Sequence, residues 1–107
     1  MTALKKKSET CDEQLRRMCK AHAEEITEGK ISIDKFMEGV YDIEWITHQD
    51  HTYKAARLLV AGGGPSIWVN LQSLKVEGYW WGCDKVEHHF LDNIGLDDYL
   101  EELYACK

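Results

Sequence analysis

Residues 53–82 read YKAARLLVAGGGPSIWVNLQSLKVEGYWWG, and this stretch decides the fold. It holds the only proline, five of the eight glycines and three of the four tryptophans. Residues 58–61 are continuously apolar, as in a strand buried on both faces, so we expect a strand over residues 53–61. The glycines and proline of residues 62–65 favour this strand over a short helix, because glycine lowers helix propensity and proline lacks an amide donor.

Two further strands are expected over residues 67–70 and 75–82, joined by a turn at residues 71–74. In an antiparallel hairpin of this length, Asn70 pairs with Lys75. One face of the hairpin then carries Val69 opposite Val76. The opposite face displays aromatic and charged side chains together: Trp68, Asn70, Lys75, Glu77, Tyr79 and Trp81.

The end of this stretch contains an unusual group of residues. Gly78 between apolar strand residues predicts a bulge or a close approach by another backbone or ring. Trp80 and Trp81 are adjacent, so in a strand they point to opposite faces. We expect one of them in the core and the other facing solvent, a covering helix or a partner.

Helices are expected on both sides of the strands. Apolar residues recur at helical spacing after Glu9, with Ser8 or Thr10 as the cap and Gly29 at the end. A second, shorter helix begins after a cap at Ser32, and residues 1–8 are predicted to be a frayed tail. The apolar positions of the two helices are Cys11, Leu15, Met18, Cys19, His22 and Ile26, then Ile33, Phe36, Met37 and Val40.

The remaining segments complete an α+β fold in a single domain spanning residues 1–107. Alternation predicts strands over residues 41–47 and 85–90, the latter at a sheet edge. Asp92 or Asn93 is expected to cap a final helix. The predicted order is a helical hairpin, a four- to five-stranded antiparallel meander and a C-terminal helix. The helices are expected to cover the face that bears Ile43, Val69, Val76 and Trp80.

Charge limits the classes of partner. The net charge is −6, and it includes three positive charges from the lysines at residues 5–7, so the rest of the chain is more acidic than this sum indicates. The final helix region carries five acids and no base: Asp92, Asp97, Asp98, Glu101 and Glu102. Such a chain is repelled by phosphates and steered towards basic surfaces, which disfavours direct nucleic-acid binding. No apolar run reaches the length of a membrane span and no signal peptide is evident, so we expect a cytoplasmic protein without membrane contact.

The four cysteines, at positions 11, 19, 83 and 106, contain no CxxC pair. In a reducing compartment they are expected to be free and largely buried thiols. One alternative is a zinc site that joins Cys83, His88 or His89 and the amino-terminal cysteines. Another is a nucleophile formed by Cys83 with one of these histidines. Neither alternative has a standard spacing, and no metal or cofactor is expected.

Other catalytic patterns are weak. The GGGPS segment, residues 62–66, lacks the lysine and following helix of a phosphate-binding loop, so a hairpin loop is expected. The HQDH segment, residues 48–51, is expected to be a turn rather than a metal or acid–base site. A helix-turn-helix DNA reader is disfavoured because the second helix has no basic face. We therefore expect no catalytic residues.

A specific resemblance covers residues 41–104. The segments GGGPSIWVN and VEGYWWG, with the acidic helix ending in EEL, resemble small accessory proteins of phages and bacterial mobile elements, a group that includes anti-CRISPR inhibitors. The matching residues are Gly63, Gly64, Pro65, Ile67, Trp68, Val69, Val76, Glu77, Tyr79, Trp80, Trp81, Glu101, Glu102 and Leu103. The resemblance implies inhibition of a host defence complex and assigns no functional residue.

Two functions from different classes follow. The first is a non-enzymatic inhibitor that binds the basic surface of a nuclease or effector complex, with Cas9 as one candidate. Its predicted contacts are Trp68, Tyr79 and Trp81 as anchors, and Asp97, Asp98, Glu101 and Glu102 as the acidic surface. The alternative is a small single-stranded nucleic-acid-binding or processing module whose sheet aromatics stack bases. Its phosphate contacts would be Lys54, Arg57, Lys75 and Lys85. A structural subunit that dimerises through the aromatic face is a third interpretation.

Overall fold

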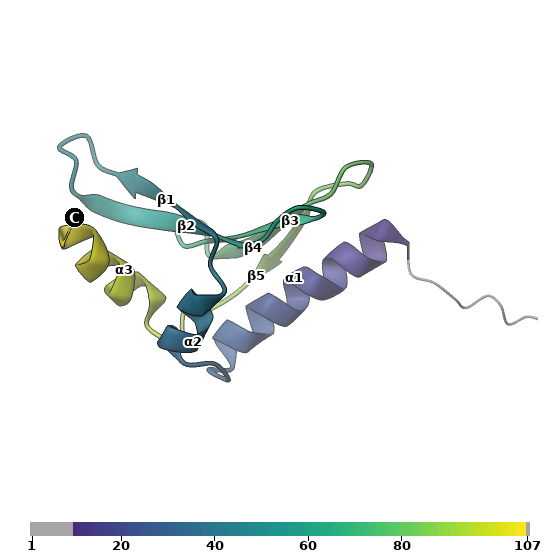
Figure 1. Ribbon diagram of the computed structural model, residues 1–107, viewed down its shortest axis with the longest axis horizontal. Helices are drawn as coiled ribbons and strands as arrows, with labels where there is room; N and C mark the ends of the chain where they lie inside the picture. Colours follow the sequence, from purple (N-terminus) through teal and green to yellow (C-terminus); the bar gives the residue numbers. More distant parts are fainter. Residues whose placement is uncertain (1–9, 107) are drawn as a thin grey trace, which may run out of the picture.

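The computed structural model describes residues 10–106, and these form three helices on one side of a five-stranded sheet (Figure 1). The predicted tail at residues 1–8 lies outside the described residues. The α+β fold class is confirmed. The elements are α1 (Cys11–Thr27), α2 (Ile33–Glu38), β1 (Asp42–Thr47), β2 (Tyr53–Ala61), β3 (Ser66–Asn70), β4 (Lys75–Tyr79), β5 (Val86–His89) and α3 (Leu96–Ala105).

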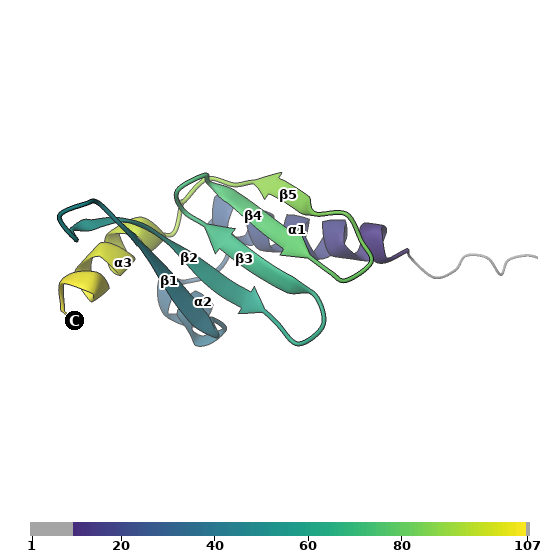
Figure 2. The ribbon, with the colours of Figure 1, turned by 90° about the horizontal axis from the view of Figure 1, so that it is seen from above.

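The sheet is an antiparallel meander in the order β1-β2-β3-β4-β5, with β1 and β5 at its edges (Figure 2). Asn70 pairs with Lys75, so the predicted register of the β3–β4 hairpin is confirmed. The expectation that this strand continues to residue 82 was wrong, because it ends at Tyr79. The amide of Cys83 donates to the carbonyl of Trp80 and turns the chain, with Gly82 at φ 83°. Trp81 therefore lies in a loop.

Strand β2 has the predicted bounds but not the predicted burial. Ala56 and Leu58 are fully buried towards the helices, whereas Arg57 between them is half-buried on the other face. The apolar run at its end coincides with a register irregularity between Leu59 and Ala61 rather than with burial on both faces. On the uncovered face, β2 therefore carries the charged side chain of Arg57 followed by the half-buried Leu59.

Each helix starts where a side chain satisfies its first amides. The Thr10 hydroxyl accepts from the amide of Glu13, whose carboxylate accepts in return from the amide of Thr10. Ser32 accepts from the amide of Lys35. Asp92 accepts from the amides of residues 95, 96 and 97, as expected of a capping side chain, although the residue at the N-cap position of α3 is Gly95 and not Asp92 or Asn93.

The core lies between the helices and the sheet face that bears Ile43, Val69, Val76 and Trp80, as predicted. Helix α1 packs on β4 and β5, and α3 packs on β2. The largest fully buried side chains of the core include Leu15, Ile26, Leu58, Ile67, Phe90, Leu96 and Leu100. The opposite face of the sheet is covered by no helix or strand within residues 10–106 (Figures 1 and 2). All three described helices therefore lie on the same face of the sheet.

Two cysteines differ from the expectation of free thiols. Cys11, the first residue of α1, forms a disulfide bond with Cys83 in the loop after β4. Cys19 is a free buried thiol and Cys106 a free exposed one. Burial raises the pKa of the Cys19 thiol to about 11. Among the helices described, none is long and apolar enough to cross a membrane.

Candidate protein-binding surface

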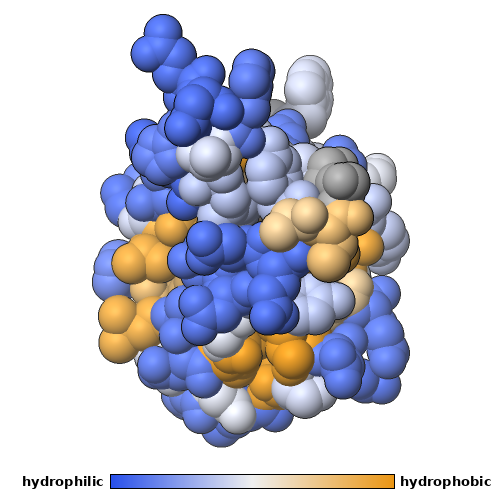
Figure 3. Space-filling view, turned by 90° about the vertical axis from the view of Figure 1, so that its left-hand side faces the viewer, coloured by the Kyte–Doolittle hydropathy of each residue, from blue (hydrophilic) through white to orange (hydrophobic). Residues whose placement is uncertain are grey.

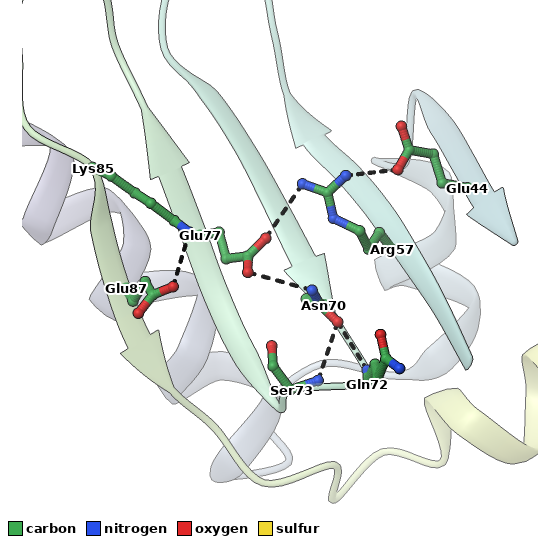
Figure 4. A network of polar contacts seen from close by, with 8 residues as sticks. All are labelled: Glu44, Arg57, Asn70, Gln72, Ser73, Glu77, Lys85 and Glu87. Atoms are coloured by element: carbon green, nitrogen blue, oxygen red, sulfur yellow. Dashed lines mark hydrogen bonds and ion pairs between the residues drawn. The ribbon is translucent and has the colours of Figure 1, made fainter. Parts of the chain in front are cut away.

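The uncovered sheet face is centred on a network of polar and charged side chains from four neighbouring strands (Figure 4). Arg57 on β2 donates to Glu44 on β1 at 2.6 Å and to Glu77 on β4 at 3.3 Å. The Asn70 amide on β3 donates to the second oxygen of Glu77 at 3.3 Å. Glu77 is only 7% exposed, so this carboxylate is held by partners rather than by water.

Aromatic rings lie on the same face and are partly covered by cations. The Arg57 guanidinium lies 4.4 Å from the centre of the Trp68 ring, within the range of a cation–π interaction. Lys85 lies 5.4 Å from the centre of the Tyr79 ring. Trp68 is half-buried and Tyr79 is exposed. Of these two predicted anchors, Tyr79 is therefore the one that presents more surface to a partner.

The cations of this face are already paired. Lys75 and Lys85 both contact Glu87, at 3.4 Å and 3.0 Å. The hydrogen bond from Lys85 lowers the pKa of Glu87, and the contact with Glu87 raises the pKa of Lys85. Together with the Arg57 pairs, three cations are balanced by three carboxylates. The charges within this set of residues therefore cancel.

Trp81 is the most exposed large apolar side chain among the described residues, at 97%. It lies in the loop between β4 and β5, which the Cys83 disulfide fastens to the start of α1. Trp80 instead packs against the core, so the predicted division of the two tryptophans is confirmed. Beside Trp81 lies a shallow hollow of about 500 Å³, lined by residues of this loop and of the β2–β3 turn, among them Gly64, Ser66, Tyr79 and Lys85. We call Tyr79, Trp81 and this hollow the aromatic end.

The predicted acidic residues lie on α3, at the opposite end of the sheet from the aromatic end (Figure 1). Asp98, Glu101 and Glu102 are exposed and form no ion pair within residues 10–106. Hydrophilic side chains dominate the view of this end, with smaller hydrophobic areas between them (Figure 3). Asp97 differs from the other three because it accepts a hydrogen bond from the Tyr53 hydroxyl at 2.7 Å. The predicted anchors and acids thus form two separate surfaces.

Asp97 takes part in the packing of α3 on the sheet. Burial, followed by the Asp97 carboxylate, raises the pKa of Tyr53. The Tyr104 hydroxyl donates to the backbone carbonyl of His51, and its ring lies 5.2 Å from that of Trp45. These contacts hold α3 against β1 and β2. A partner-binding role is therefore open to Asp98, Glu101 and Glu102, whereas Asp97 already has a structural role.

The candidate metal and nucleophile residues are arranged differently from the prediction. Ligand atoms of Cys11, Asp12 and Cys83 lie within 4.8 Å of one another, but both sulfurs are used in the disulfide. Cys83 is therefore not a thiol in this structure, which removes the basis for a Cys–His nucleophile. The HQDH segment is a turn, as expected, in which Asp50 accepts from the amide and hydroxyl of Thr52.

His22 lies at the edge of the core, as predicted for a core-edge histidine. It lines a small cavity of about 120 Å³ with Glu25, Ile31 and Lys35. Burial lowers the pKa of His22, while the nearby Glu25 acts in the opposite direction. The imidazole is therefore held in its neutral form near pH 7.

The sequence interpretation missed a group of bases on α1: Arg16, Arg17 and Lys20. They lie on the side of α1 that faces strand β5, where Lys85 joins them. The sequence did contain a signal for this group. Arg17 and Lys20 follow Arg16 by one and four residues, outside the apolar stripe, so the three bases lie close together on the surface of a helix. Without the register of β5, nothing in the sequence placed Lys85 beside them.

Comparison with known proteins gives no relative. No protein-family model, no curated protein and no solved structure matches this chain.

Proposed function

We propose that this chain is a non-catalytic binding protein that inserts Trp81 into an apolar pocket of a protein partner. The exposure of Trp81 carries the proposal. A large indole that is 97% exposed contributes almost nothing to the core, yet its loop is fastened to α1 by a disulfide. Exposed aromatic side chains on restrained loops are typical anchors of protein interfaces, because little conformational freedom is lost on binding.

The partner class follows from charge and from the sequence resemblance. The exposed acids of α3 favour a basic surface, and nucleases and effector complexes present such surfaces where they hold nucleic acid. The resemblance to accessory proteins of mobile elements points to a host defence complex, with a Cas nuclease such as Cas9 as the candidate. The aromatic end and α3 lie at opposite ends of the sheet. A partner that contacts both must therefore have a binding surface that spans the length of the domain.

The test is inhibition of DNA cleavage by a panel of purified Cas nucleases. Trp81→Ala is expected to weaken inhibition by roughly 30-fold, which corresponds to a loss of about 2 kcal/mol at an interface anchor. Tyr41→Ala is the matched control, because Tyr41 is 74% exposed and precedes β1, away from the loop that carries Trp81. Equal effects of the two substitutions would contradict the role of Trp81, and the absence of inhibition across the panel would contradict the partner class.

The acidic part is tested separately. Combined Asp98→Asn, Glu101→Gln and Glu102→Gln substitutions are expected to weaken binding and to reduce its dependence on salt. Asp97 is left unchanged because its loss would also break the contact with Tyr53. An unchanged salt dependence would remove α3 from the interface.

The single-stranded nucleic-acid module remains the second candidate, because Trp68 and Tyr79 do share the uncovered sheet face. Its phosphate contacts are weakened by the structure, since Arg57, Lys75 and Lys85 are each paired with a carboxylate. Fluorescence anisotropy with a single-stranded RNA at low salt distinguishes the two. Affinity that is lost in Tyr79→Ala would favour base stacking over the inhibitor.

A further inference from the structure

A groove of about 330 Å³ runs between α1 and strand β5. It is lined by Arg16, Arg17, Lys20, Lys85, Val86 and His88, with Glu87 as its acid. In Figure 2, β5 forms one edge of the sheet and α1 runs beneath β4 and β5. The groove is therefore bordered by a helix with basic side chains on one side and by a strand edge on the other.

The edge of β5 can accept another strand. β5 pairs with β4 on one side, from Val86 with Gly78 to His89 with Lys75, and pairs with no strand of the described chain on its other side. The backbone amides and carbonyls of such an edge are available for pairing with an extended peptide. A peptide bound there would lie along the mouth of the groove.

The register of β5 determines which side chains such a peptide would meet. Val86 and His88 pair with Gly78 and Val76, whose face of the sheet packs against α1. Glu87 points to the uncovered face, where Lys75 and Lys85 hold it. Because side chains alternate along a strand, every second residue of an added strand would face the bases of α1.

Two of these bases, Arg16 and Lys20, are available to a partner. Arg16 and Arg17 are exposed, and Arg16 forms no ion pair within residues 10–106. Lys20 lies 3.8 Å from Glu24, in a pair whose two side chains are each about half exposed or more, so this pair is readily exchanged for another acid. The groove is therefore a locally positive site on a chain of net charge −6.

We propose that this groove binds an extended acidic segment of a partner protein, which adds to the edge of β5 as a sixth strand. The segment carries acids at alternate positions, facing Arg16 and Lys20, and its backbone pairs with residues 86–89. A peptide fits better than a nucleic acid for two reasons. The strand edge offers hydrogen bonds to a peptide backbone, and the groove is lined by no tryptophan, tyrosine or phenylalanine on which a base could stack.

The probe is a fluorescein-labelled peptide in which Glu and Val alternate. Its length of about eight residues is within the usual range for a strand. Its anisotropy with the full chain is expected to report binding that weakens with salt, while an alternating Lys and Val peptide does not bind. The double variant Arg16→Glu and Lys20→Glu is expected to weaken binding by about tenfold or more. The control Lys35→Glu and Lys54→Glu makes the same change in net charge outside the groove and is expected to retain binding.

Strand addition is tested by methylating alternate peptide amides, which removes donors and leaves the charges in place. The methylated peptide should lose binding, and amide exchange at residues 86–89 should slow only with the unmodified peptide. Equal binding of both peptides would overturn strand addition, and tighter binding of a single-stranded oligonucleotide would reassign the groove to nucleic acid. Trp81→Ala should leave peptide binding unchanged, so failure of the groove and failure of the proposed anchor are separate results.

Discussion

At Gly78, helix α1 packs directly against the backbone of the sheet. A methyl group placed there would lie 2.5 Å from the Sγ atom of Cys19 and 2.9 Å from a methyl carbon of Leu15. Gly78→Ala is therefore expected to lower the free energy of unfolding by about 1–3 kcal/mol through overpacking. Urea denaturation followed by tryptophan fluorescence measures the loss.

The matched control is Gly78→Ala combined with Cys19→Ala, which removes the nearest atom. The cost of Gly78→Ala should be smaller in this background than in the natural chain. An equal cost in both backgrounds would show that the close approach does not limit the packing.

His22 gives the fold a predicted dependence on pH. Its pKa is lowered in the folded state, so below about pH 6.5 the unfolded chain binds a proton more readily than the folded one. This contribution to stability is present above the ordinary pKa of histidine and is lost as the pH falls towards the lower folded value. The urea midpoint should therefore decrease between about pH 7.5 and about pH 5.5.

Substitution of His22 by Gln isolates this effect. The variant should show a smaller decrease in the urea midpoint over the same range, because glutamine does not titrate. The other groups of the cavity, Glu25 and Lys35, remain in place. An identical decrease in both proteins would assign the pH dependence elsewhere.

At the level of elements, the network on the uncovered face joins β1, β2, β3 and β4. Arg57→Ala leaves the buried Glu77 carboxylate without its cation and is expected to cost about 2–3 kcal/mol. Glu44→Ala should cost less than about 0.5 kcal/mol, because the Glu44 side chain is half exposed. Urea denaturation of the two variants compares these costs.

A double-mutant cycle separates the charge effect from lost packing on Trp68. In a Glu77→Gln background no buried charge is left behind, so Arg57→Ala should cost clearly less. If the cost is the same in both backgrounds, the contact of Arg57 with Trp68 is the main contribution and the ion pair is not.

The order and type of the elements were predictable because each depends on nearby residues. Alternation and a four-residue turn were enough for the Asn70–Lys75 register, and Thr10, Ser32 and Asp92 marked the helix starts. The pairing of Glu77 with Arg57 was not predictable, because it depends on the register of β2 against β3. That register shifts between Leu59 and Ala61, so it cannot be counted from the length of the connecting loop.

The candidate site was predicted only in part for the same reason. The sequence identified Trp81 and the acidic helix as candidates, but their places at opposite ends of the sheet depend on how α3 packs on β2. The α1 bases and Lys85 are far apart in the sequence, and only the packing of α1 on β5 brings them to one groove.

At the level of the whole molecule, the disulfide between Cys11 and Cys83 closes a loop of 72 residues that contains most of the fold. Cys11→Ser with Cys83→Ser is expected to lower the free energy of unfolding by about 4 kcal/mol, because the unfolded chain gains conformational entropy. Thermal unfolding followed by circular dichroism measures the change. Cys106→Ser is the control, since this exposed thiol lies outside the closed loop and should have little effect.

A reducing agent added to the natural protein should reproduce the effect of the double substitution. An unchanged melting temperature in both experiments would contradict a stabilising role. The same double variant also tests whether the loop of Trp81 must be fastened, because a freed loop would lose more entropy on binding and inhibit less.

The acids of α3 lie on the helix that packs on β2, whereas the bases of α1 lie beside β5 at an edge of the sheet, so charges of opposite sign are separated across the molecule and contribute an electric moment. In the field of a basic surface, such a moment turns the approaching molecule before any atoms touch, most strongly at low ionic strength. The α3 end would arrive first and the groove would point away. A chain oriented in this way could hold a basic partner on one end and an acidic one on the other, joining two proteins that do not bind each other.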